Sequence, residues 1–252
     1  MDILKTIMEH RTIRKYKCDL IPENILKQIL EAGFRASTTG NMQVYSIIVS
    51  KEEEMRKKLW ELHFKQDMVK QAPVVLTFCA DFNRFNKWCR QRKAEPCYDN
   101  FLSFFTAAID ALLAAQNCAV AAESFGLGIC YLGTTTYMAD KIADLLNCPE
   151  GVVPVTTLVV GYPDEKPELA DRLPVKGIVH KETYHDYSTD DIEKIYRTKE
   201  TLPQTAELLI INELETLAQI FVQKRYTRKD NVYFSKQFLK VIKDKGFMNN
   251  EE

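Results

Sequence analysis

The chain lacks the short motifs that most often identify nucleotide-binding proteins and hydrolases. It has no G-x-G-x-x-G after a candidate strand and no G-x-x-x-x-G-K-[ST], so the usual glycine-rich phosphate loops are missing. It also has no G-x-S-x-G nucleophile elbow and no H-E-x-x-H zinc motif. If the chain binds a phosphate group, we therefore expect side chains to hold it.

The cysteines show no metal-binding or disulfide pattern. No C-x-x-C occurs, and the spacing does not match the four histidines as ligands. An odd number of scattered cysteines is typical of a reducing compartment. The segment MDILKTIMEH carries acids and lacks the order of a signal peptide. We expect a cytoplasmic protein without a metal site, whose cysteines are Cys18, Cys79, Cys89, Cys97, Cys118, Cys130 and Cys148.

The chain also has no large excess of positive or negative charge. The chain has 34 Lys+Arg and 35 Asp+Glu, so no overall field attracts nucleic acid, and an anion site has to be local. A DNA-binding role for a basic helix is therefore disfavoured. The segment HRTIRKY (10–16) is the exception, because it concentrates positive charge in seven residues.

One long apolar stretch, Phe101 to Gly128, raises the question of a membrane span. Polar residues interrupt it, including Asp110 and Glu123, and a bilayer penalises such groups by several kcal/mol. We predict a buried central helix that ends near Gly126, and no membrane partner. Its many alanines would let another helix approach closely.

The remaining patterns predict a mixed α+β fold with a central sheet flanked by helices. Apolar spacing predicts helices at 3–8 and 22–34, and helical patterning resumes near Asp190. We assign residues 1–187 to a core and residues 188–252 to a C-terminal helical extension of the same domain. The strand candidates are 44–50, 73–80, 128–133 and 154–163.

The basic segment has two interpretations. Basic residues at the end of a first helix are most often a solvated face that suits the helix dipole. Alternatively, Arg11 and Arg14 lie three apart on one side of that helix, with His10 and Thr12 adjacent, so one phosphate could meet both guanidinium groups.

Six segments together resemble the FMN-dependent nitroreductase family, and most closely its larger branch of NADPH-type, oxygen-insensitive nitroreductases and flavin reductases. They follow the family's order, and the likeness weakens after about Tyr187. The segments are HRTIRKY (10–16), ASTTGNMQVYSIIVS (36–50), FCADFNR (78–84), AAESFGLGICYLG (121–133), VVGYP (159–163) and RLP (172–174).

The resemblance implies a mainly antiparallel sheet and an intertwined homodimer with FMN in clefts at the subunit interface. The implied contacts to the FMN phosphate and ribityl chain are His10, Arg11, Thr12 and Arg172. Those at the pyrimidine edge of the flavin are Arg14 and Gln66. The partner subunit would supply Ser37, Thr38, Thr39 and Asn41. Beneath the ring would pass Tyr131, Leu132, Gly133 and Thr134.

Taken alone, several of these residues have ordinary explanations. STTGN is a common turn composition, Gln66 resembles a surface amide, and Tyr131 resembles a core aromatic residue. The glycines of GLGICYLG (126–133) are compatible with a backbone that approaches a flat ring, because a glycine has no Cβ.

The implied activity is a two-step, ping-pong reduction of nitroaromatics, quinones or free flavin by NAD(P)H, with NADPH favoured. The flavin performs the hydride chemistry, so we expect no catalytic nucleophile and no metal. An FMN-binding or sensor protein without efficient turnover is the alternative.

Two further positions bear on this activity. Arg225 and Arg228 in QKRYTRK (223–229) match a basic loop for the NADPH 2′-phosphate, although a solvated basic turn explains them equally well. Ala170 stands where the family places a lysine near the flavin, two residues before Arg172. Loss of that cation implies a lower flavin potential, unless Lys176 replaces it.

Overall fold

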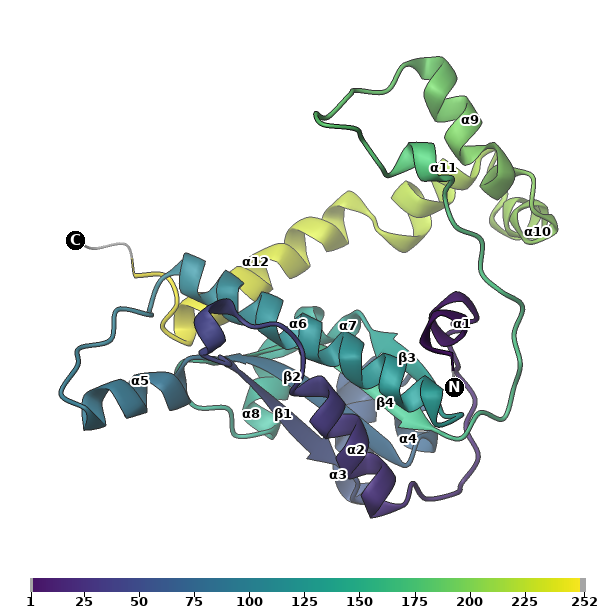
Figure 1. Cartoon of the computed structure of the whole chain (residues 1–252). Coiled ribbons are helices and arrows are strands. Elements are labelled where there is room, and N and C mark those ends of the chain that lie inside the picture. Colours follow the sequence, from purple (N-terminus) through teal and green to yellow (C-terminus); the bar gives the residue numbers. More distant parts are fainter. Residues whose placement is uncertain (1, 250–252) are drawn as a thin grey trace. The chain divides into compact units, whose positions relative to one another are not determined.

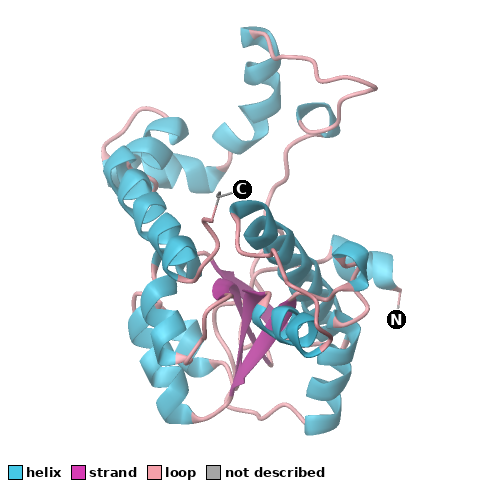
Figure 2. Ribbon diagram, turned by 90° about the vertical axis from the view of Figure 1, so that its left-hand side faces the viewer, coloured by secondary structure: helices cyan, strands magenta, loops and turns pink. Residues whose placement is uncertain are grey.

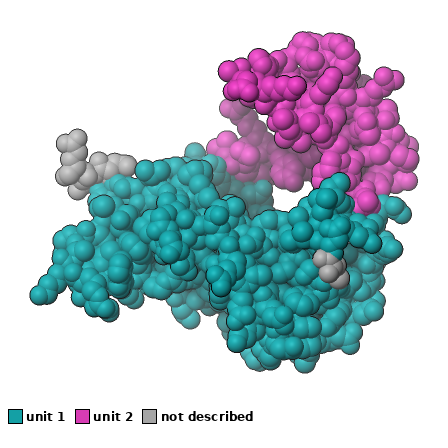
Figure 3. Space-filling model, in the orientation of Figure 1, with its two compact units in different colours: residues 1–168, 234–252 teal, residues 169–233 magenta. Residues whose placement is uncertain are grey.

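The computed structural model describes residues 2–249 and divides into two compact units (Figure 3). The first unit comprises Met1–Glu168 with Phe234–Glu252, and the second comprises Leu169–Tyr233. This division does not coincide with the expected boundary at residue 187. The chain from Phe234 returns to the first unit because its apolar side chains, among them Phe238 and Phe247, pack against Phe104.

The first unit is built on a four-stranded antiparallel sheet (Figure 1). Its spatial order is β1-β2-β4-β3, with Ile47 opposite Phe78 and Cys130 opposite Val159. Each predicted strand is present within two residues of its expected ends. The strands are β1 (Tyr45–Ser50), β2 (Val74–Asp81), β3 (Gly128–Leu132) and β4 (Val152–Gly161).

Helices cover both faces of this sheet, and Figure 2 shows the strands lying between them. Side chains alternate along a strand, so Leu76 and Leu158 face one helical layer while Val75 and Val159 face the other. The first layer consists of α2 (Glu23–Gly33) and α6 (Phe101–Ser124). The second consists of α3 (Glu53–Leu62), α4 (Asp67–Gln71) and α8 (Ala139–Leu145). Burial on both faces explains why β2 and β4 are almost continuously apolar.

The long apolar stretch is the core helix α6, as predicted. Within the described residues it is the one helix long and apolar enough to cross a membrane, but its alanines are buried against α2 and the sheet. The helices approach so closely that a Cβ on Gly33 would lie 2.4 Å from Cys118 Sγ. The chain leaves α6 through Gly126, whose φ of 76° is in the left-handed region, so the predicted end is confirmed.

The other helices are short or belong to the second unit. In the first unit they are α1 (Ile3–Met8), α5 (Asn83–Gln91), α7 (Thr134–Tyr137) and a 3₁₀ turn, η1 (Thr39–Asn41). The second unit holds η2 (Val175–Gly177), α9 (Thr189–Glu200), α10 (Pro203–Asn212), α11 (Leu217–Ile220) and the π-helix η3 (Phe221–Arg225). The last helix, α12 (Arg228–Asp244), begins in the second unit and continues into the first.

The segment after α1 joins the edge of the sheet. Ile13 N donates to Ile129 O at 2.9 Å, and Thr12 forms a parallel bridge with Ile129 of β3. This pairing needs a glycine at 128, because a Cβ there would lie 2.6 Å from Ile13 Cγ1. Gly128 therefore admits Ile13, which differs from the expected role of letting the backbone approach a flat ring.

We predict that Gly128→Ala destabilises the protein by about 1–3 kcal/mol, because the added methyl group overpacks against Ile13. Gly133→Ala is the matched control. A Cβ at Gly133 meets nothing within 4 Å, and its φ of −64° suits alanine. The free energy of unfolding in urea checks the prediction, and equal stability of the two variants would contradict it.

Candidate functional site

The two arginines expected to act together do not share a helix face. α1 ends at Met8, and the backbone from His10 to Tyr16 is non-helical where it pairs with β3. In extended backbone, residues three apart point to opposite sides. Arg11 faces a cavity, whereas Arg14 is exposed and its backbone N–H donates to Glu165 Oε1 at 2.5 Å. The expected helical pairing is therefore wrong.

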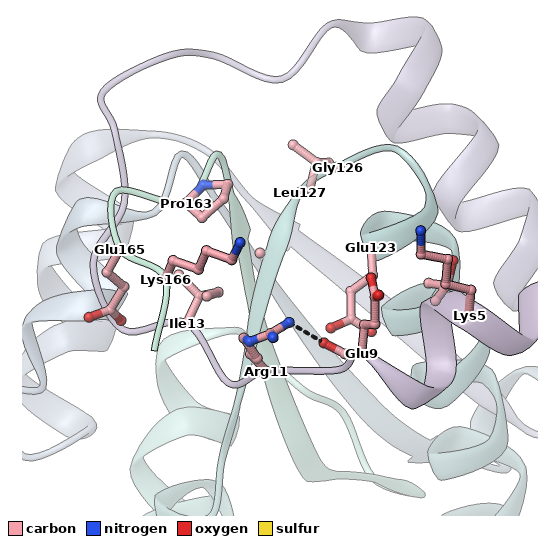
Figure 4. A pocket seen from close by; sticks show the side chains of 12 residues that line it. Lys5, Glu9, Arg11, Ile13, Glu123, Gly126, Leu127, Pro163, Glu165 and Lys166 are labelled. Carbon is pink, nitrogen blue, oxygen red and sulfur yellow. Dashed lines mark hydrogen bonds between the residues drawn. The ribbon is translucent and has the colours of Figure 1, made fainter. Parts of the chain in front are cut away.

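The cavity beside Arg11 has a volume of about 380 Å³ and lies between α1, the end of α6 and the chain after β4 (Figure 4). Arg11 Nη1 donates to Glu9 O at 2.9 Å, while its Nε is buried without a hydrogen-bond partner among the described residues. A buried N–H without an acceptor is costly until an acceptor arrives. The charged lining residues are Lys5, Arg11 and Lys166, with Glu9, Glu123 and Glu165.

Two carboxylates of this cavity already have partners. Glu123 Oε1 lies 2.6 Å from His10 Nδ1, which fixes the imidazole against the end of α6. Glu165 Oε1 accepts the backbone N–H groups of Arg14 and Lys15. Neither glutamate was predicted from the sequence as a site residue. The signal at Glu123 was available, because an acid near the end of an apolar helix needs a partner.

A second cluster joins Gln66 and Thr134, which the resemblance placed at the flavin. Gln66 Nε2 donates to Thr134 Oγ1 at 3.3 Å and to His63 O at 3.0 Å. His63 Nδ1 lies 2.8 Å from the same threonine oxygen. His63 is fully buried, and burial lowers its pKa to about 4, so the imidazole is neutral at physiological pH. Nothing in the sequence singled out His63.

The end of β3 carries the other residues expected beneath the ring. Tyr131 is partly exposed, and its hydroxyl donates to Gln116 Oε1 at 3.4 Å, while burial of the hydroxyl raises its pKa. Leu132 is buried in the core, so its side chain points away from solvent. Gly133 is exposed and has open space where a Cβ would lie. An approaching ring is therefore compatible with Gly133 and Tyr131.

The segment from Ser37 to Asn41 lies elsewhere on the same unit. The backbone N–H of Thr39 donates to Asp110 Oδ1 at 3.0 Å, and Asp110 is fully buried in α6. His10 contacts Glu123 of the same helix. At 1.5 Å per residue, Asp110 and Glu123 are separated by about 20 Å along α6. One chain therefore does not bring residues 37–41 together with His10.

Three predicted arginines belong to the second unit. Arg172 Nη1 donates to the carbonyl oxygens of Ala170 and Asp171, and the Asp171 carboxylate pairs with Lys199 at 2.7 Å. Arg225 ends η3 and lies over the Phe221 ring, 5.6 Å from its centre. Arg228 is exposed at the start of α12.

The buried His63 makes stability depend on pH. Its folded pKa of about 4 lies below its usual value of 6.5, so between these values the unfolded chain binds a proton that the folded chain does not. The stability that the neutral His63 ring contributes is therefore fully present above pH 6.5. This contribution falls by roughly 3 kcal/mol as the pH drops to the folded pKa. Urea unfolding at neutral and acidic pH checks this: His63→Asn should lose clearly less stability than the wild type, and a parallel loss in both would contradict the assignment.

Comparison with known proteins identifies the family. The "Nitroreductase family" model matches residues 7–162. The FMN reductase (NADPH) of Bacillus subtilis (strain 168) is 34% identical over 197 residues, which cover 77% of this chain and 79% of the relative. The structure of the NfrA1 nitroreductase from B. subtilis matches with a TM-score of 0.86 and 29% identity, covering 98% of this chain and 99% of that one. A solved protein from Bacteroides fragilis NCTC 9343 matches with a TM-score of 0.96 and 51% identity, covering 97% and 100%. This chain therefore belongs to the nitroreductase family, which confirms both the resemblance read from its motifs and the expected α+β fold.

Proposed function

We propose that this protein is an FMN-dependent oxidoreductase that takes electrons from NAD(P)H and passes them, two at a time, to a small acceptor such as a nitroaromatic, a quinone or free flavin. The observation that carries the proposal is Arg11, whose guanidinium lines a cavity and whose buried Nε has no hydrogen-bond partner among the described residues. Arg11 also lies within the part of the chain that the family model matches. The name of the B. subtilis relative, which links FMN to NADPH, supports this cofactor pair.

The residues of the first unit fit FMN. The phosphate of FMN is an acceptor of the kind that the unused Arg11 N–H requires. The open surface at Gly133 admits a flat ring, and Gln66 and Thr134 offer amide and hydroxyl groups beside it. Of these residues we assign His10, Arg11 and Thr12 to the phosphate and ribityl chain, and the family resemblance adds Arg172, which belongs to the second unit.

When bound, FMN supplies the ring that accepts hydride and later gives up the electrons. The protein's part is positioning and electrostatics. Arg14 is exposed and carries a permanent positive charge, so at the pyrimidine edge it would stabilise the negative charge that develops on reduction. Protons come from water, and no side chain acts as a nucleophile.

A second copy of the chain would complete the cleft. Residues 37–41 and His10 are fastened to α6 about 20 Å apart, so these two predicted sets meet only if different subunits contribute them. The outer side of α6 offers a surface for such a partner. It carries an exposed apolar stripe at helical spacing, which comprises Leu102, Phe105, Ile109, Leu112 and Leu113. We therefore propose a homodimer with FMN at the interface, in the cytoplasm.

Turnover separates this enzyme from an FMN-binding sensor. The purified protein with FMN should oxidise many equivalents of NADPH when a quinone or nitroaromatic is present. FMN binding without sustained NADPH consumption would contradict the enzymatic function and support an FMN-binding sensor instead.

Removing the two phosphate-binding arginines should release FMN. Each guanidinium supplies charge-assisted hydrogen bonds worth about 1.5–3 kcal/mol, so Arg11→Ala with Arg172→Ala should weaken FMN binding at least a hundredfold. The matched control removes one exposed arginine from each unit, by Arg90→Ala with Arg197→Ala. Flavin fluorescence measures the dissociation constant, and full occupancy of the first double variant would contradict the assignment.

The preference for NADPH over NADH tests whether the basic turn at residues 223–229 binds the 2′-phosphate. If Arg225 and Arg228 hold the 2′-phosphate, changing both to alanine should raise the KM for NADPH by about tenfold or more and leave that for NADH nearly unchanged. Arg197→Ala, an exposed arginine of the same unit, controls for loss of charge. Equal effects on the two nucleotides would assign these arginines to a solvated turn, with Arg225 held by Phe221.

A further inference from the structure

The turn from His63 to Gln66 adopts a costly backbone. Phe64 and Lys65 are consecutive non-glycine residues with φ of 55° and 57°, in the left-handed region. Such residues cost about 1–3 kcal/mol each and persist where the surroundings fix them. Here Lys65 N donates to Trp60 O at 2.9 Å and Gln66 N donates to His63 O at 3.2 Å. The turn places both the His63 ring and the Gln66 amide on the Thr134 hydroxyl.

The protonation of His63 follows from its surroundings. The ring is fully buried and neutral, so only one nitrogen carries a proton. Nδ1 lies 2.8 Å from Thr134 Oγ1, whereas Nε2 is buried with no partner among the described residues. A buried N–H without an acceptor is rarer in proteins than an unused acceptor. We therefore place the proton on Nδ1, which makes His63 a donor to Thr134.

This assignment fixes what the Thr134 hydroxyl can do. A hydroxyl oxygen accepts two hydrogen bonds and donates one. His63 Nδ1 and Gln66 Nε2 occupy both acceptor positions of Thr134 Oγ1. The hydroxyl proton is then left for a third group, and Thr134 is half-buried at the start of α7, directly after the open Gly133.

We propose that His63 is a positioning residue which, with Gln66, turns the Thr134 hydroxyl into a hydrogen-bond donor to the bound flavin ring. The inference rests on the proposed function, because it requires FMN at this site. Reduction adds electron density to the ring, so a donor at its edge stabilises the reduced form more than the oxidised form. His63 therefore contributes to FMN affinity and raises the flavin potential without touching the cofactor.

A pair of near-isosteric variants isolates the contact. Asparagine at position 63 can place an amide N–H where Nδ1 stands, because both atoms are bonded to Cγ, whereas leucine has a similar shape and no donor. His63→Leu should weaken FMN binding about fivefold and lower the two-electron midpoint potential. His63→Asn should restore most of both losses. Thr134→Val should reproduce the leucine variant, since it removes the hydroxyl itself.

A double-variant cycle tests whether His63 acts through Thr134. If it does, His63→Leu with Thr134→Val should be no worse than either single variant in FMN affinity and potential. Additive losses, or an unchanged potential in Thr134→Val, would overturn the proposal. If His63→Leu does not fold, judged by circular dichroism, His63→Gln replaces it, because its amide reaches the Nε2 position and not the Nδ1 position.

FMN binding by the wild-type protein distinguishes a failure of the proposed function from a failure of the His63 role. A wild-type protein that binds no FMN refutes the proposed function. A wild type that binds FMN, with His63→Leu and Thr134→Val matching it in potential and affinity, refutes only the role of His63.

Discussion

The pairing of Thr12 and Ile13 with Ile129 is the contact on which the site depends. It extends the basic segment along β3 and sends Arg11 into the cavity while Arg14 stays in solvent. The close approach leaves no room for a side chain at Gly128. Glu165 completes the arrangement, because it accepts the next two backbone N–H groups that the sheet does not use. A short stretch of edge pairing thus separates two arginines that a helix would have kept together.

Helix α6 sets the spacing of the remaining parts. The two acids of α6 each bind a different segment: Asp110 accepts hydrogen bonds from the backbone at Thr39 and Val44, and Glu123 contacts His10. A buried carboxylate needs such partners, because an isolated charge in the core is strongly unfavourable. The acids that argued against a membrane span in the sequence are the same ones that position the proposed cofactor contacts. Their separation is also the reason why a second subunit is part of the proposal.

Patterns that depend on local sequence predicted much of the fold. Alternating or continuous apolar runs located all four strands, and Gly126 marked the end of the core helix. The family resemblance rested on six ordered segments, and it is confirmed.

Features that depend on contacts between distant parts of the chain were not predicted from the sequence. HRTIRKY is compatible with a helix by propensity, but it is non-helical in the structure, where Thr12 forms a bridge with Ile129 and Tyr16 forms a bridge with Pro163. His63 gave no signal, because its burial and its contact with Thr134 arise from a turn between two helices. The return of residues after Phe234 to the first unit depends on aromatic packing against Phe104, which no local pattern contains.

We propose that the Arg11 cavity and the Gln66–Thr134 cluster hold a flavin that NADPH reduces. The most direct measurement is the absorption spectrum of the purified protein loaded with FMN, taken without oxygen before and after NADPH is added. We expect flavin bands that stay with the protein on desalting, disappear with NADPH and return when a quinone is added. A protein that retains no flavin, or whose flavin bands persist with NADPH, would contradict it.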